Sequence, residues 1–270
     1  MASTGSARAF CRLTTSTTFQ PTPANPCDTV GTPLEWRQPC MGYAVQIAGS
    51  DDLPVDTVEL ALQTSFSRWA AVTCPDGPLP LAFTYHGRAT CEVAEYRREG
   101  PNVPVIVFRE GSWPSDYDPN AFALTSVWHN TRTGEILDAD MEFNGARFTF
   151  GVLSAESCGP SSLTADIENV ATHEVGHFLG LAHSADGEAT MYGMACAGEI
   201  EKRSLAPDDV AGICAIYPNG VDRGRCDPTP NNGLDLACGP FESDDCSVAA
   251  VGARGTTADD GARSGWLIVA

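Results

Sequence analysis

The pattern of apolar and polar positions changes several times along the chain, and each change indicates a new element. Residues 1–33 are rich in Thr and Pro and show no helical or strand period, so we expect an extended arm there. From residue 42 onward, Tyr43, Val45 and Ile47 alternate with smaller or polar residues, which predicts a strand.

A long amphipathic helix is predicted between residues 53 and 73. Its apolar residues recur at the spacing of one helix face, at Val55, Val58, Leu62, Phe66 and Trp69. Pro54 precedes them, and proline suits the first turn of a helix because its fixed φ is already helical.

Further strands and helices follow in the pattern. The strands are expected at 80–87, 103–110, 121–129 and 136–144, and the last two flank a turn at 130–135. Residues 161–166 offer several N-cap candidates for a helix that carries most of the histidines. A final helix begins at Pro207 and stops at Pro218. The rest of the chain is rich in Gly, Asp, Pro and Cys, which indicates a tail rather than a second folded domain.

Three of the five histidines lie in one short stretch, THEVGHFLGLAHS. On a helix, His173 and His177 lie one turn apart on the same face, where two imidazoles can bind a single divalent ion. Glu174 can reach a water on that ion without being a ligand. Gly180 can end the helix through a positive φ, and the turn brings His183 back as a third ligand. Three protein nitrogens leave one position for water, which is the catalytic form of a zinc site.

The length of this motif decides how much weight it carries. A bare HExxH occurs by chance in many helices, whereas the extended HExxHxxGxxH adds further fixed requirements. Met191 stands eight residues after His183. A lone methionine is more often core filler. In this position, however, it resembles the Met-turn beneath the metal of the metzincin metalloproteases.

Charge excludes one class of partner. The chain of 270 residues has 16 Lys and Arg against 35 Asp and Glu, a net charge of −19. Nothing basic clusters to replace the counterions of a phosphate backbone, so we expect no nucleic-acid partner. The acidic residues are expected to form a solvated face, with calcium binding by some of them as the alternative.

Eleven cysteines are spread along the chain without a CxxC pair, which favours disulfides in an oxidising compartment. We expect the pairs Cys74 with Cys91, Cys196 with Cys214, and Cys226 with Cys238. The odd thiol is expected to be Cys246, with Cys11 as the alternative, and a zinc-blocking role for Cys11 or Cys27 is a further hypothesis.

The first residues lack the apolar run of a secretory signal, which a removed signal would explain. No stretch approaches the ~20 apolar residues of a membrane span, so we expect no span in this chain.

Four segments, in order, resemble one known family. They are LEWRQPCMGYAVQIAGSDDLPVDTVELALQTSFSRWAAVT, HEVGHFLGLAHS, TMYGM and LAPDDVAGICAIYP. Together they resemble the catalytic domain of the matrixins, the matrix-metalloproteinase branch of the metzincins, over residues 34–218. Ser184 and the DDxxGIxxxY pattern of the last helix favour matrixins over sister families.

The resemblance implies an α+β metzincin fold. In that fold a twisted, mixed five-stranded sheet lies under two long helices and an active-site cleft, and a smaller C-terminal subdomain with a final helix follows Gly180. It implies a zinc endopeptidase domain at 34–218, between the arm at 1–33 and the tail at 219–270. The strand at 121–129 would have an unpaired edge beside the zinc helix, to which a peptide could add.

The resemblance also implies roles for single residues. His173, His177 and His183 would bind zinc, Glu174 would move the proton, and Met191 would shape the floor beneath the metal. Tyr192 and the chain around it would help form the pocket for the residue after the cut, which we expect to be apolar. The expected substrates are proteins or peptides, and the expected state is a monomer. A catalytically dead binding protein on the same fold is the rival reading, but its usual mark, a lost glutamate or ligand, is absent here.

Some family features are missing. The PRCGVPD motif that blocks the zinc of animal matrixins is absent, and no propeller-like repeat follows the catalytic part. His86 and His129 stand isolated and do not match the ligands of a second, structural zinc. A secreted, bacterial-type relative therefore fits better. The stretch DDCSVAAVGARG faintly resembles the start of bacterial sorting tails, which would mean attachment to the cell surface; a disordered acidic tail is the alternative.

Overall fold

The computed structural model describes residues 9–16, 27–159 and 162–239 and the backbone of 261–269. Its centre is a sheet in the order β12-β7-β8-β6-β2-β5. The five strands from the first two thirds of the chain are β2 (Cys40–Gln46), β5 (Ala82–Ala89), β6 (Val105–Phe108), β7 (Ala121–Asn130) and β8 (Ile136–Phe143). Strand β7 runs antiparallel to β8, and the other pairs among these five are parallel. The predicted mixed five-stranded sheet is confirmed.

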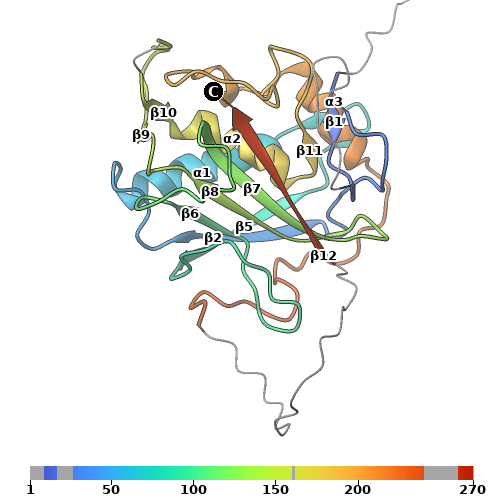
Figure 1. Ribbon diagram of the computed structural model, residues 1–270. Coiled ribbons are helices and arrows are strands. Elements are labelled where there is room, and N and C mark those ends of the chain that lie inside the picture. Colours follow the sequence, from blue (N-terminus) through green and yellow to red (C-terminus); the bar gives the residue numbers. More distant parts are fainter. Residues whose placement is uncertain (1–8, 17–26, 160–161, 240–260, 270) are drawn as a thin grey trace, which may run out of the picture.

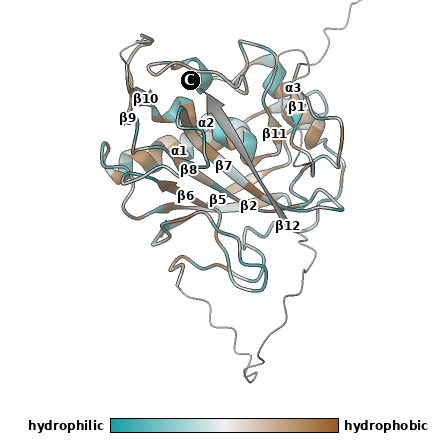
Figure 2. Cartoon of the chain, in the orientation of Figure 1, coloured by the Kyte–Doolittle hydropathy of each residue, from teal (hydrophilic) through white to brown (hydrophobic). Residues whose placement is uncertain are grey.

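Helices α1 (Val55–Ala70) and α2 (Ile167–Phe178) lie on one face of this sheet (Figure 1). Four of the five residues predicted for the apolar face of α1 are buried and Val55 is half-buried. Trp69 of this face donates an indole hydrogen bond of 2.9 Å to the carbonyl of Thr172 in α2. All four residues of β6 are buried, in line with the apolar run at 103–110, and Figure 2 shows this strand as hydrophobic. The core therefore lies between the sheet and the two helices.

Short strands connect the long elements. They are β1 (Cys11–Arg12), β3 (Thr73–Cys74), β4 (Gly77–Pro78), β9 (Thr149–Gly151), β10 (Thr164–Asp166) and β11 (Leu181–Ala182). Sequence patterns did not predict them because two or three residues carry no period. Strand β1 pairs with β11, so this described part of the N-terminal arm packs against the segment that follows α2.

The last helix, α3 (Pro207–Ile216), begins and ends close to the predicted residues. It is followed by Tyr217, whose hydroxyl donates to the carbonyl of Leu179 at 2.8 Å and accepts from the backbone N–H of Trp36 at 3.2 Å. The ends of α2 and α3 and the entry into the sheet are thereby fixed to one another. In the described part of the chain, no helix combines the length and the apolar character needed to cross a membrane.

The three predicted disulfide pairs are wrong. The structure joins Cys11–Cys27, Cys40–Cys226, Cys74–Cys214, Cys91–Cys238 and Cys158–Cys196. Cys74 and Cys91 stand on either side of β5, and the eight residues of this strand extend over roughly 26 Å. A disulfide requires Cα atoms within about 7 Å of each other, so the two ends of a strand cannot be bridged.

The other two predicted pairs are wrong for a related reason. The fold brings each of these cysteines next to a partner that is distant in the sequence. Cys214 faces Cys74 from α3, which leaves Cys196 to pair with Cys158. Cys226 is bonded at the start of β2, and Cys238 is bonded just beyond the end of β5. Cys11 and Cys27 are bonded to each other, which contradicts both the odd-thiol alternative and the zinc-blocking hypothesis. Cys246 lies outside the described residues.

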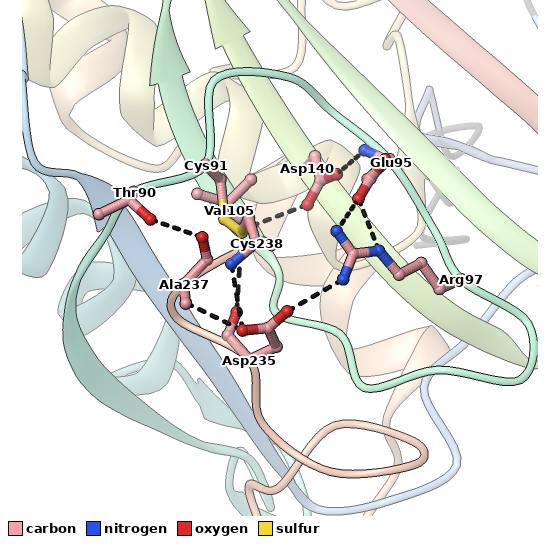
Figure 3. Close-up of a disulfide and its surroundings, with 9 residues drawn as sticks. All are labelled: Thr90, Cys91, Glu95, Arg97, Val105, Asp140, Asp235, Ala237 and Cys238. Atoms are coloured by element: carbon pink, nitrogen blue, oxygen red, sulfur yellow. Dashed lines mark hydrogen bonds and ion pairs between the residues drawn. A yellow bond between two sulfur atoms is a disulfide. The ribbon is translucent and has the colours of Figure 1, made fainter. Parts of the chain in front are cut away.

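Figure 3 shows how the segment before residue 239 is attached to the sheet. Beside the Cys91–Cys238 disulfide, the Thr90 hydroxyl donates to the carbonyl of Ala237 at 2.6 Å, and Arg97 pairs with Asp235 at 2.9 Å. These contacts hold the start of the predicted tail against the loop that follows β5.

The predicted unpaired edge of β7 is also corrected. Strand β12 (Gly261–Val269) pairs antiparallel with β7, from Gly261 opposite Asn130 to Val269 opposite Ala121. In Figure 1 this strand crosses the front of the molecule toward α2. The sequence did not predict this strand because its apolar end was read as part of a tail.

Candidate active site

Helix α2 starts where its N-cap residue satisfies the first free backbone groups. The Asp166 carboxylate accepts a hydrogen bond of 2.8 Å from the N–H of Asn169. The same carboxylate pairs with Arg203, in the 3-10 turn Glu201–Arg203, and accepts from the N–H of Leu153 at 2.9 Å. The start of the helix is thus joined to segments on both sides of it.

The three predicted histidines lie together. The Nε2 atoms of His173 and His177 are 3.0 Å apart, and one nitrogen from each of His173, His177 and His183 lies within 4.8 Å of the others. His173 Nδ1 lies 2.6 Å from the carbonyl oxygen of Thr190, and His177 Nδ1 lies 2.8 Å from that of Leu181. Because a carbonyl only accepts, each Nδ1 carries the proton and each Nε2 presents a lone pair.

Burial keeps these imidazoles neutral. It is the main cause that lowers the pKa of His177 to about 4 and the pKa values of His173 and His183 well below their usual range. Three converging, neutral imidazole nitrogens with oriented rings fit Zn²⁺, which takes histidine nitrogens at about 2.0–2.1 Å. In the described residues no second group of three His, Cys, Asp or Glu side chains is gathered in this way, so calcium is not assigned to particular residues.

Gly180 makes the turn that the third histidine requires. Its φ is +93°, and a Cβ atom there would lie 2.8 Å from the carbonyl oxygen of Leu34. The chain then enters β11 and reaches His183, as predicted.

Met191 lies beneath helix α2. It is 1% exposed, and its Sδ atom would be 2.1 Å from a Cβ atom added to Gly176, so the helix approaches the methionine closely only because residue 176 is glycine. The carboxylate of Asp209 holds the turn by accepting from the N–H groups of Thr190 and Met191 at 2.8 and 2.9 Å. In the sequence, Asp209 stood out only as part of the DDxxGIxxxY pattern of the last helix.

Glu174 is buried beside the histidines. Burial raises the pKa of its carboxyl to about 8. The hydroxyl of Thr125 in β7 donates to its Oε2 atom at 2.5 Å, whereas Oε1 has no hydrogen-bond partner among the described residues. Thr125 was not predicted from the sequence, although a hydroxyl between the apolar Ala123 and Val127 of β7 was a signal that could have revealed it.

Tyr192 is half-buried next to Met191, and its hydroxyl lies 3.9 Å from the sulfur of Met194. The chain beyond it is held by the Cys158–Cys196 disulfide and by the buried Lys202, whose Nζ donates to the carbonyl of Met194 at 2.9 Å.

Cavity size does not mark this site. Two of the larger cavities, of about 400 and 210 Å³, are lined by residues around Cys91 with Cys238 and around Trp36 with Arg223, without any of the three histidines. The chemistry of the side chains identifies the site instead.

A mixed sheet under two helices, a helical pair of histidines, a third histidine after a glycine turn and a methionine below them define a metzincin zinc peptidase domain. The chain belongs to the matrixin family, whose sequence profile matches residues 35–218.

Relatives support this assignment. The chain is 29% identical to neutrophil collagenase of Homo sapiens over 222 residues, which are 81% of this chain and 39% of the relative. It is 32% identical to metalloendoproteinase 5-MMP of Arabidopsis thaliana over 181 residues, 64% of this chain and 44% of the relative. It is 28% identical to matrilysin of Homo sapiens over 188 residues, 68% of this chain and 58% of the relative. The chain therefore matches between two fifths and three fifths of the length of these relatives.

Proposed function

We propose that this protein is a zinc-dependent endopeptidase in which His173, His177 and His183 bind the metal. The observation that carries the proposal is the convergence of their three nitrogens within 4.8 Å beside a buried glutamate. Zinc bound by these residues would polarise the scissile carbonyl as a Lewis acid and would lower the pKa of water, so that the water loses a proton more easily and becomes a stronger nucleophile.

Residues of the chain orient the imidazoles that bind the metal and transfer the proton. The carbonyls of Thr190 and Leu181 hold two imidazoles in the tautomer that binds metal. Glu174 takes the proton of the attacking water and delivers it to the leaving amine. Its position supports this role, because the buried side chain lies next to His173 and its Oε1 atom has no hydrogen-bond partner among the described residues.

We further propose that an extended substrate pairs with the outer edge of β7. Strand β12 supports this, because its pairing there demonstrates that the edge accepts an extended segment in the antiparallel direction. Met191, Tyr192 and the segment held by Cys158–Cys196 then form the pocket for the residue after the cut. The small or apolar residues of this segment favour an apolar side chain in that pocket.

The five disulfides and the extracellular character of matrixins support secretion of the protein. We also propose that the enzyme acts on proteins or peptides as a monomer, and that cell-surface attachment depends on the segment after residue 239.

The test is incubation of the purified protein with casein or a peptide library, with and without a zinc chelator, followed by mass spectrometry of the products. We expect chelator-sensitive cuts before apolar residues. Cuts mainly before charged residues would contradict the pocket, and intact substrate under all conditions would favour a binding protein instead.

Glu174→Ala separates the roles of ligand and proton carrier. We expect it to keep zinc and peptide binding and to lose turnover by a factor on the order of 10² to 10⁴, because only the proton transfer is removed. His173→Ala is the matched contrast and should lose zinc as well, since two nitrogens leave the first shell incomplete. Zinc analysis and single-turnover rates measure both; near-normal turnover of Glu174→Ala would refute the mechanism.

A further inference from the structure

We propose that Thr125 is a positioning residue that fixes the carboxylate of Glu174 for proton transfer. This inference deepens the proposed function, on which it rests. The two residues are 49 apart in the sequence and come together only because α2 lies on β7. Both residues are fully buried, and the exposed fraction of each is 0%.

The position of Thr125 in β7 is unusual for its surroundings. Ala123 and Val127, two residues before and after it, are buried in the hydrophobic core. An alanine or valine would therefore complete the row, whereas a buried hydroxyl is costly without a partner. Its hydroxyl lies 2.5 Å from Glu174 Oε2 and 3.3 Å from the Glu174 carbonyl oxygen. The presence of a threonine at position 125 is thus explained by its hydrogen bonds to Glu174 and not by packing in the core.

The bond selects one orientation of the carboxylate. The last torsion of a glutamate side chain has broad minima, so a buried carboxylate without a donor could turn between its two oxygens. A hydroxyl on Oε2 stops this rotation and leaves Oε1, which has no hydrogen-bond partner among the described residues, as the oxygen that exchanges the proton. Threonine suits the task better than serine because its branched Cβ restricts χ1 and aims the hydroxyl.

Thr125→Val tests the hydroxyl at nearly constant shape. We expect kcat to fall about 10- to 100-fold with KM and zinc content unchanged, because misplacement of a catalytic group by about 1 Å costs rate rather than binding. Thr125→Ser keeps the hydroxyl and should retain kcat within about threefold.

Ser65→Ala is the matched control. Ser65 is also fully buried, and its hydroxyl donates to the carbonyl of Ala61 at 3.0 Å and accepts from the hydroxyl of Thr172 at 3.1 Å, whereas the hydroxyl of Thr125 donates to Glu174. We expect this variant to lower the melting temperature and to leave kcat unchanged. A kcat of Thr125→Val within twofold of the wild type, at wild-type zinc content, would overturn the proposal.

A readout without turnover separates this inference from the proposed function. In chelator-treated protein, melting temperatures are compared for Thr125→Val, Glu174→Gln and the double variant. We expect the shift of the double variant to differ from the sum of the single shifts. Additive shifts would show that the two side chains are not coupled, whatever the activity of the wild type. A coupled pair in a protein without chelator-sensitive turnover would contradict the proposed function and leave the Thr125 contact established.

Discussion

Two aspartates at alternate positions of β8 place their carboxyl groups in the interior of the protein. Asp138 is 1% exposed and Asp140 is 0% exposed. Asp140 is fully used, because it accepts from the N–H of Val105 at 2.7 Å and of Glu95 at 2.9 Å and thereby holds the loop between β5 and β6 (Figure 3). Asp138 accepts from the N–H of Ala139, and its Oδ2 atom has no hydrogen-bond partner among the described residues.

Burial raises the pKa of Asp138 to about 8. In the unfolded chain an aspartate titrates near ~3.9, so between these values the folded state holds a proton that the unfolded state lacks. The free energy of unfolding must then decrease as the pH rises through this window, and the loss is complete above the folded pKa. Asp140, whose pKa is also raised by burial, contributes in the same direction.

Asp138→Asn should remove part of this pH dependence, because the amide mimics the protonated acid and does not titrate. We expect the variant and the wild type to melt at similar temperatures near pH 5, and the variant to melt higher near ~pH 9. Scanning calorimetry at both pH values measures the difference. Parallel curves for the two proteins would show that Asp138 is ionised in the folded state.

At the level of elements, β12 occupies the edge that a substrate would need. Its Trp266 stands opposite Thr125, the residue that contacts Glu174, so the strand passes the level of the candidate catalytic group. Two strands cannot pair with the same edge of β7, so β12 and a substrate bound there as proposed would exclude each other.

Deletion of residues 240–270 should therefore lower KM. We expect kcat to stay within about twofold, because the deletion leaves the zinc site and Glu174 intact. Initial rates over a range of peptide concentrations measure both constants, and zinc content confirms the integrity of the site. An unchanged KM in the shortened protein would mean that β12 does not compete with substrate.

The elements also show what the sequence could and could not predict. Helix α1 and the strands β2, β5, β6, β7 and β8 were predictable because each repeats its period over several residues, and the group of three histidines was predictable because its spacing is local. The partner of Cys74 was not, since it depends on where α3 lies on the strand pair β3 and β4. Thr125 and Asp209 escaped for the same reason, because each acts on a residue distant in the sequence.

For the whole molecule, the disulfides differ in how much of the chain they constrain. Cys40–Cys226 closes a separation of 186 residues, whereas Cys11–Cys27 closes one of 16. In the chain-entropy account, the longer loop restricts the unfolded state more, because loop-closure entropy grows with the logarithm of length.

The paired substitution Cys40→Ser with Cys226→Ser should therefore cost about 2–5 kcal/mol of the free energy of unfolding. The matched pair Cys11→Ser with Cys27→Ser is expected to cost less, by about 1 kcal/mol, because the intact Cys74–Cys214 disulfide shortens the loop that Cys40–Cys226 closes. Urea denaturation of both double variants provides the comparison. A larger loss at Cys11–Cys27 would show that local packing, rather than loop length, governs these bonds.

The long disulfides also determine what the cleavage of a single peptide bond would do to the molecule. Cys40–Cys226, Cys74–Cys214 and Cys91–Cys238 each connect the first part of the chain to the last. One broken peptide bond between Cys91 and Cys214 would leave two fragments that stay covalently joined at three points, and a cut between Cys158 and Cys196 would leave them joined at four. Before reduction, His173, His177 and His183 would remain in one covalently connected molecule, which would run at its full mass on a non-reducing gel. Only after reduction would the nicked molecule separate into two bands.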